Sequence, residues 1–199
     1  MPKASPESPP MFESNFIDYF SRTHFSIVPI LYVPGSAVLI WYSLARAGLS
    51  PWLTSGLVLL GFGSWTLTEY WLHRTFFHWQ PGGKWGERMH FLVHGVHHTW
   101  PRDKYRLVMP PAVSITLYCT FLGFFLLVAG KTYGPALHAG YVIGYMYYDL
   151  MHYYLHHGRP KSDYHKELKR HHMVHHFKDP TRRYGVSSKF WDYVFRTES

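Results

Sequence analysis

Residues 107–130, LVMPPAVSITLYCTFLGFFLLVAG, form a run of 24 residues without Asp, Glu, Lys or Arg. A helix of about 20 residues covers the roughly 30 Å hydrocarbon core of a bilayer. Two similar uncharged runs precede it, 23 residues at 23–45 and 22 residues at 47–68. A shorter run, 136–148, continues helically beyond Asp149. The sequence therefore predicts an all-α integral membrane protein with four transmembrane helices in two hairpins.

The rest of the chain fits a single membrane-embedded domain. Three uncharged runs above 20 residues make buried helices of a soluble protein a poor alternative. Residues 1–10, rich in proline and serine, are expected to form a disordered tail before a domain of residues 11–199. The expected spans are about 24–45, 51–72, 108–130 and 135–156.

The basic residues predict how the spans are oriented. Of the 20 Lys and Arg residues, the two hairpin loops hold only Arg46 and Lys131, and the other 18 lie on the side of both termini. The positive-inside rule places that side in the cytoplasm. The net charge of +8 is then explained by topology and anionic headgroups, so nucleic-acid binding is not expected. An endoplasmic reticulum membrane and a bacterial inner membrane both fit this pattern.

Histidines on the predicted cytoplasmic side indicate a metal site. Ten of the 16 histidines fall into four motifs, H-x-x-x-x-H, H-x-x-H-H, H-x-x-x-H and H-x-x-H-H. They are His73, His78, His94, His97, His98, His152, His156, His172, His175 and His176. Neutral imidazole is the commonest side-chain metal ligand. Because one tetrahedral ion needs only four ligands, ten histidines suggest two metal ions.

The spacings predict which rings converge. Residues three and four apart share one face of a helix, so His152 with His156, and each H-x-x-H-H motif, can direct their rings to one point. His73 and His78 are five apart and would diverge on a straight helix. We expect that helix to end or bend near Phe76, or else the two rings to bind different metals.

Two acids stand near the predicted ligands. Glu69 lies four residues before His73, and Asp149 lies three residues before His152. We expect both as second-shell residues, because a carboxylate that accepts the distal N–H of a ligating imidazole fixes its tautomer. An all-nitrogen set suits iron, copper or zinc. Two irons imply O₂ chemistry on a lipid; two zincs could hydrolyse one, although no carboxylate is placed to bridge them.

Four stretches carry a family resemblance. They are EYWLHRTFFH (69–78), MHFLVHGVHHTWPRDKYRLVMPP (89–111), YYDLMHYYLHH (147–157) and HHMVHHFKDPTRRYGVSSKFWDYVFRT (171–197). The chain resembles the integral-membrane fatty acid hydroxylase superfamily, and within it the fatty acid 2-hydroxylases that act on sphingolipids. One departure is Arg196, which stands where the family often has glycine.

The resemblance implies a non-haem diiron site held by the ten histidines, in a cytosolic helical cap over four transmembrane helices. Zinc can substitute for iron in a purified sample. It further implies hydroxylation at C2 of a long acyl chain with O₂ as co-substrate and electrons from cytochrome b5. Some members carry a fused cytochrome b5 domain. This sequence shows no haem-binding motif, so a separate electron donor is expected.

Aromatic and basic residues at the helix ends are candidates for an acyl groove and a headgroup site. They are Tyr70, Tyr148, Tyr153, Tyr154, Lys104 and Arg106. An ordinary aromatic belt and a positive-inside surface explain them equally well. Two other functions remain open: a superfamily oxygenase acting on a sterol or carotenoid, and a non-catalytic metal-binding membrane protein such as a transporter.

Overall fold

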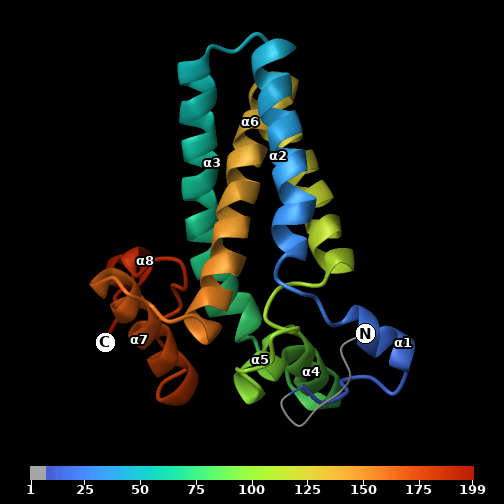
Figure 1. Ribbon diagram of the computed structural model, residues 1–199, viewed down its shortest axis with the longest axis vertical. Helices are drawn as coiled ribbons and strands as arrows, with labels where there is room; N and C mark the ends of the chain where they lie inside the picture. The colour runs from blue at the N-terminus through green and yellow to red at the C-terminus, as the bar shows by residue number, and fades with distance from the viewer. Residues whose placement is uncertain (1–7) are drawn as a thin grey trace.

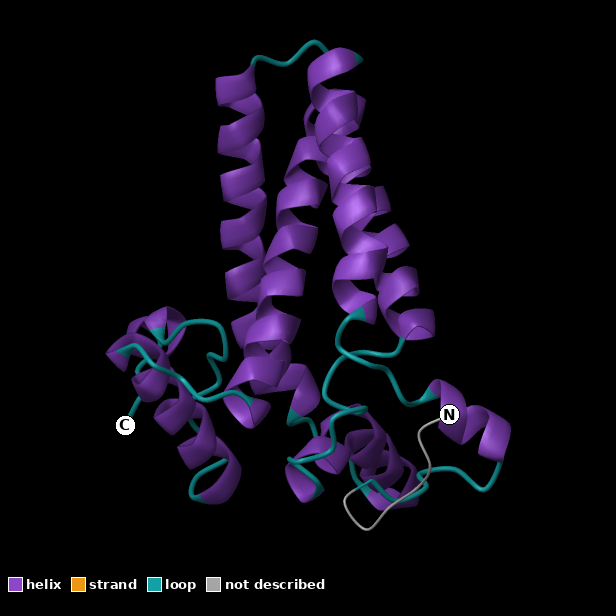
Figure 2. Ribbon diagram, in the orientation of Figure 1, coloured by secondary structure: helices purple, strands orange, loops and turns teal. Residues whose placement is uncertain are grey.

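The structure, a computed structural model, describes residues 8–199, and regular secondary structure in that range is entirely helical (Figure 2). The elements are α1 Asn15–Phe20, α2 Ile27–Ala45, α3 Pro51–Trp71, the π-helix η1 Leu72–Phe77, α4 Gly83–His90, the π-helix η2 Phe91–Gly95, α5 Val96–Thr99, α6 Pro111–His157, α7 Asp163–Phe177 and α8 Phe190–Val194. Figure 1 shows α2, α3 and α6 as a long bundle. Helices α1, α4, α5, α7 and α8 lie at one end of it and form what we call the short-helix layer.

Helix α6 is two antiparallel arms joined at Gly130. Gly130 has φ 67° and ψ 177°, a left-handed φ that glycine adopts without steric cost. The two arms pack against each other, with ring centroids 4.6 Å apart for Tyr118 and His138 and 4.8 Å apart for Phe121 and Tyr141. The bundle thus contains four helical rods. The connection expected between the spans 108–130 and 135–156 is reduced to a turn at Gly130, and the second arm begins before residue 135.

Glycines set how closely α3 and α6 approach. A Cβ atom on Gly61 of α3 would lie 2.0 Å from the Leu137 carbonyl oxygen, and one on Gly140 of α6 would lie 2.0 Å from the Val58 carbonyl oxygen. Small residues at helix contacts are typical of packing inside membranes. The contact fixes the register between α3, which leads into His73, and α6, which carries His152.

The outer surface of the bundle is apolar. Leu127 is 85% exposed, Leu59 71% and Ile30 63%, and all three lie on bundle helices. Exposed apolar surface on this scale marks contact with a membrane or a partner. Among the described residues, α2 and α6 are long and apolar enough to cross a membrane.

The N-terminal segment is anchored to the segment between α5 and α6. Ser8 is buried and donates its hydroxyl to Asp103 at 2.6 Å, and Arg106 pairs with Asp18 at 2.8 Å. The disordered tail predicted for residues 1–10 is therefore wrong for Ser8, while residues 1–7 lie outside the described range. The headgroup role predicted for Arg106 is also wrong, because its guanidinium is buried in this ion-pair network.

Candidate metal centre

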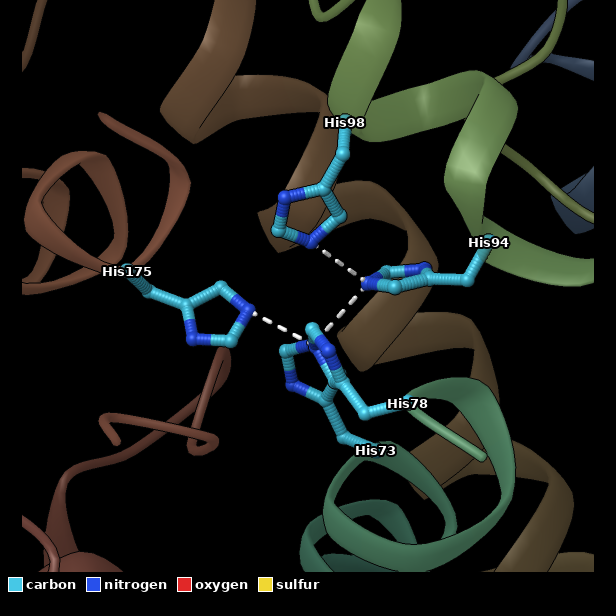
Figure 3. A group of neighbouring side chains, drawn as sticks. All are labelled: His73, His78, His94, His98 and His175. Atoms are coloured by element: carbon cyan, nitrogen blue, oxygen red, sulfur yellow. Dashed lines mark hydrogen bonds between the residues drawn. The ribbon is translucent and has the colours of Figure 1, made fainter. Parts of the chain in front are cut away.

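The ten predicted histidines gather in two groups of five. The His73 cluster consists of His73, His78, His94, His98 and His175, and the His97 cluster consists of His97, His152, His156, His172 and His176. Within each cluster one nitrogen from every ring lies within 4.8 Å of the others. Figure 3 shows the rings of the His73 cluster converging from separate segments of the chain. The structure thus brings together every histidine that the spacings selected.

A π-helix explains why His73 and His78 share one cluster. The sequence predicts that this helix ends or bends near Phe76, and the structure agrees: α3 passes into η1 at Leu72, and η1 ends at Phe77. In a π-helix the backbone bonds run from residue i to i+5, so residues five apart lie over one another. The two Nε2 atoms are accordingly 3.3 Å apart.

The two H-x-x-H-H motifs do not direct their rings to one point, which corrects the expectation from spacing. The outer members, His94 and His98, enter the His73 cluster, while His97 enters the other. In the second motif the outer members enter the His97 cluster, while His175 enters the His73 cluster. In each motif the two histidines four residues apart share a cluster, and the histidine three residues after the first one enters the other cluster. Both motifs therefore connect the two clusters.

The distances between ring nitrogens fit metal ligands. In the His73 cluster, Nε2 of His73 lies 3.1 Å from that of His94, and Nε2 of His78 lies 3.0 Å from that of His175. Two nitrogens each about 2.1 Å from one ion, at right angles, would be about 3 Å apart. Each N–H can serve only one acceptor, so mutual hydrogen bonds cannot satisfy five converging rings. A cation at the centre satisfies all of them.

Backbone carbonyls fix two rings of the His73 cluster. Nδ1 of His73 donates to the Tyr184 carbonyl oxygen at 2.5 Å, and Nδ1 of His175 donates to the Arg182 carbonyl oxygen at 2.6 Å. A neutral imidazole that donates from Nδ1 carries its lone pair on Nε2. Both Nε2 lone pairs therefore point to the cluster centre, the arrangement that metal-binding histidines require.

The His97 cluster fits an ion for a different reason. Nε2 of His97 and both ring nitrogens of His152 are buried without a hydrogen-bond partner in the described part of the chain. Such atoms are rare in folded proteins and call for an explanation, such as an ion. Nε2 of His172 lies 2.9 Å from that of His156 and 3.2 Å from that of His176, as in the first cluster.

The rings are neutral at neutral pH. Burial lowers the pKa of His78 to about 3 and the pKa of His98 to about 4, and the neighbouring His175 ring adds to both shifts. Burial also lowers the pKa of His94 and His172 well below the ordinary histidine value. Neutral rings keep their lone pairs available for a metal.

The two acids predicted to hold ligating imidazoles have other partners. Glu69 is buried and accepts hydrogen bonds from Val186 and Ser187, not from His73. Asp149 is buried, its Oδ2 has no partner within residues 8–199, and no bond joins it to His152. The prediction that Glu69 and Asp149 accept hydrogen bonds directly from ligand imidazoles is therefore wrong.

Asp192 is the acid that the sequence did not reveal. It is fully buried, accepts the Tyr184 and Gly185 amides, and lies 3.0 Å from Nε2 of His171. No ligand spacing places it near a histidine motif, since its partners are backbone amides and a ring outside the clusters. In the sequence, the available signal was an acid inside the aromatic stretch FWDYVF (190–195).

An apolar cavity lies inside the bundle beside the His73 cluster. Its lining includes Tyr32, Trp65, Leu72, Phe77, Tyr145 and Tyr148. The Phe77 ring stacks on His94 with centroids 5.3 Å apart, so the cavity borders the cluster. Tyr148, one of the predicted acyl-groove residues, lines this cavity. Tyr70 does not, because it is fully buried against Phe195 and its hydroxyl lies 3.0 Å from that of Thr197.

A second hollow adjoins the His97 cluster. It is lined by Tyr153, Tyr154, Lys104, Arg102 and His156, among others. Arg102 and Lys104 are exposed and give it a basic rim. The two hollows therefore differ in character: one is apolar and inside the bundle, and the other is basic and at the surface.

Comparisons with a family profile, with individual proteins and with solved structures all relate this chain to fatty acid hydroxylases. The profile of the family described as fatty acid hydroxylase matches residues 58–197. The dihydroceramide fatty acyl 2-hydroxylase of Arabidopsis thaliana is 39% identical over 96% of this chain and 80% of its own length. The ceramide very long chain fatty acid hydroxylase of Schizosaccharomyces pombe is 39% identical over 96% of this chain, which spans 55% of that protein. A solved structure of scs7p, with only the hydroxylase domain visible, superposes with a TM-score of 0.89 at 35% identity and covers 98% of this chain and 72% of that one.

Proposed function

The chain belongs to the fatty acid hydroxylase family, and from that premise we propose that it hydroxylates C2 of long-chain acyl groups carried by ceramides or related sphingolipids. It is an O₂-dependent enzyme. One oxygen atom enters the C2–H bond, and the other leaves as water with two electrons and two protons. The observation that carries the proposal is the pair of five-histidine clusters beside an apolar cavity.

The ten histidines would hold two iron ions, five rings to each ion. Iron bound there supplies the activation of O₂. The protein contributes neutral rings, lone pairs fixed by the Tyr184 and Arg182 carbonyls, and an apolar cavity beside them. Imidazole nitrogen also suits zinc, so zinc can occupy the same positions in a purified sample.

The two hollows suggest how a substrate would lie. C2 of an acyl chain stands between a polar group and a long apolar tail. The tail would enter the apolar cavity past Phe77 and Tyr148, and the polar group would remain near Tyr153, Tyr154 and Lys104. The carbon between them then faces the metal centre, which supports attack at C2 over attack far along the chain.

The bundle would cross the membrane four times, through α2, α3 and the two arms of α6. The exposed apolar side chains and the glycine contacts between α3 and α6 support this arrangement. The C-terminus and the short-helix layer lie at one end of the bundle (Figure 1), and α5 and α7 of that layer carry histidines of both clusters. The excess of Lys and Arg on that side supports a cytoplasmic location. The membrane would be an endoplasmic reticulum or bacterial inner membrane, with cytochrome b5 or an equivalent protein as electron donor.

The test uses purified, iron-loaded protein with O₂, a reductase–cytochrome b5 chain and a long-chain ceramide. We expect the 2-hydroxy product, and deuterium at C2 should be lost from it. The His172→Ala variant, which removes a ring of the His97 cluster, should form none. A fully iron-loaded protein that gives no 2-hydroxy product would contradict the proposed reaction.

A further inference from the structure

Residues 182–187 connect the His73 cluster to two buried carboxylates. Two carbonyls of this segment accept from ring nitrogens of the cluster, at 2.5 Å from His73 to Tyr184 and 2.6 Å from His175 to Arg182. These two rings enter the cluster from different parts of the chain (Figure 3). One short segment therefore orients two of the five rings.

The peptide group between Tyr184 and Gly185 links Asp192 to His73. Its carbonyl accepts from His73, and its N–H donates to Oδ2 of Asp192 at 2.7 Å. The C=O and N–H of a trans peptide point in opposite directions, so the carboxylate and the imidazole lie on opposite sides of one planar group. Oδ1 of Asp192 also accepts the Tyr184 amide at 2.9 Å. Asp192 thus holds the Tyr184–Gly185 peptide group from the side opposite the His73 cluster.

The peptide group between Arg182 and Arg183 is held in a related way. Its carbonyl accepts from His175, and its N–H donates to the Thr197 carbonyl at 2.9 Å. Thr197 in turn donates its hydroxyl to Oδ1 of Asp192 at 2.7 Å and its amide to the Asp192 carbonyl at 2.8 Å. Asp192 therefore supports both ring-binding peptides.

Glu69 fixes the other end of the segment. Its Oε1 accepts the amides of Val186 at 2.9 Å and Ser187 at 2.8 Å, and its Oε2 accepts the Ser187 hydroxyl. Glu69 lies one helical turn before His73. Four consecutive amides, 184 to 187, thus donate to two buried carboxylates.

We propose that Asp192 and Glu69 are positioning residues for the metal of the His73 cluster. They act through the 182–187 segment, which fixes the tautomer and direction of His73 and His175. The inference rests on the proposed function, since it requires that the His73 cluster bind a metal. Glu69 thus supports the ligand rings indirectly, through backbone amides. Asp192 gains a role at the metal centre that no histidine motif indicates.

The experiment measures each metal of the purified, loaded enzyme by competition with a chelator and by the visible spectrum after cobalt substitution. Asp192→Asn places an NH₂ group opposite a backbone N–H, whichever way the amide turns, because both carboxylate oxygens accept amides. We expect one metal to bind about 10- to 100-fold more weakly and the other to be unchanged. The cobalt spectrum of only one site should change.

Glu69 offers a matched pair if Asp192→Asn fails to fold. Glu69→Ala leaves two amides without an acceptor, whereas Glu69→Gln retains one oxygen that can accept both, as Oε1 does now. We expect Glu69→Ala to weaken the same metal and Glu69→Gln to restore most of the affinity. Glu167→Gln, on a half-buried carboxylate of α7 that pairs with Arg170, is the control and should change neither metal.

The outcomes separate the two proposals. His98→Ala, a ligand variant of the His73 cluster, identifies which release step belongs to that cluster. The inference is overturned if Asp192→Asn and Glu69→Ala leave that step unchanged, or weaken both metals equally, as a general loss of stability would. Wild-type protein that binds no metal overturns the proposed function itself and the inference with it.

Discussion

The two histidine clusters hold the same number of rings but support them differently. In the His73 cluster, two Nδ1 atoms donate to carbonyls of the 182–187 segment. In the His97 cluster, Nδ1 of His152, His172 and His176 has no hydrogen-bond partner within residues 8–199. Every ring of the His97 cluster comes instead from a helix, α5, α6 or α7.

The difference teaches that equal ligand counts do not imply equal sites. Helices fix the rings of the His97 cluster through backbone packing, so that cluster should tolerate changes in loops. The His73 cluster draws His78 from the end of a π-helix and relies on a polar segment for the direction of two rings. Its metal should therefore respond most to substitutions outside the ligands themselves.

The largest expected effect comes from removing one ring of each cluster. His73→Ala and His172→Ala should each lower hydroxylase activity by more than about 100-fold, because a lost ligand costs more than a lost partner of a ligand. Metal analysis of the purified variants should show that each weakens a different metal. If both variants lost activity equally but released different metals, both clusters would be required for the reaction while binding separate ions.

The control is His24→Ala, an exposed histidine outside both clusters. It should retain both metals and full activity. If His73→Ala and His172→Ala released the same metal, the division into two clusters would be wrong.

The ten rings could be predicted from sequence, but their division could not. Spacings of three and four identify residues on one helical face and selected eight of the ten, and the five-residue spacing of His73 and His78 added the other two. Whether His97 follows His94 or turns to the other cluster depends on the rotation of α5 between α6 and α7, which no local pattern encodes. The π-helix that joins His73 and His78 is likewise invisible, because its residues also suit an α-helix.

In the fold, too, local sequence patterns predicted some features, whereas features that depend on contacts between distant segments were missed. Uncharged length predicted three of the apolar rods, since each must match the thickness of a bilayer, and the shorter run 136–148, which continues past Asp149, predicted the fourth. The single-residue turn at Gly130 and the reciprocal contacts of Gly61 and Gly140 depend on distant segments meeting. Asp192 was missed for the same reason.

The next effect in size is on the bundle that carries both clusters. Gly140→Val should lower the free energy of unfolding by about 1–3 kcal/mol or more, because its Cβ would lie 2.0 Å from the Val58 carbonyl oxygen and the helices must separate. Thermal unfolding in detergent measures it. Gly123→Val, on the same helix with no atom within 4 Å of its Cβ, is the matched control.

Gly140→Val tests whether the His97 cluster depends on helix packing. Helix α6 carries His152 and His156 and packs on α3, which leads to His73. A shift between α3 and α6 should therefore weaken both metals together. Loss of the His73 metal alone would mean that the His97 cluster does not depend on helix packing.

A smaller effect is expected from Ser187→Ala. Glu69 loses one hydroxyl donor but keeps the amides of Val186 and Ser187, so the loss is about one hydrogen bond, roughly 0.5–1.5 kcal/mol. Only part of it should reach the metal. Chelator competition should show the His73 metal weakened a few-fold and the other unchanged.

Ser64→Ala is the control, because that hydroxyl bonds only the Gly61 carbonyl within α3. It should leave both metals as in the wild type. A Ser187→Ala variant that weakened only the His97 metal would reverse the comparison.

The smallest effect is expected at the basic hollow, which borders the His97 cluster through His156. Lys104 is exposed, and an exposed charge contributes about 0.2–1 kcal/mol to a polar contact. Lys104→Ala should therefore raise KM for a ceramide by at most about fivefold, leave kcat unchanged and lose its effect at high salt. Lys161→Ala, an exposed lysine outside the hollow, should leave KM unchanged. A fall in kcat with constant KM would instead place Lys104 in electron delivery, since a headgroup contact acts on binding alone.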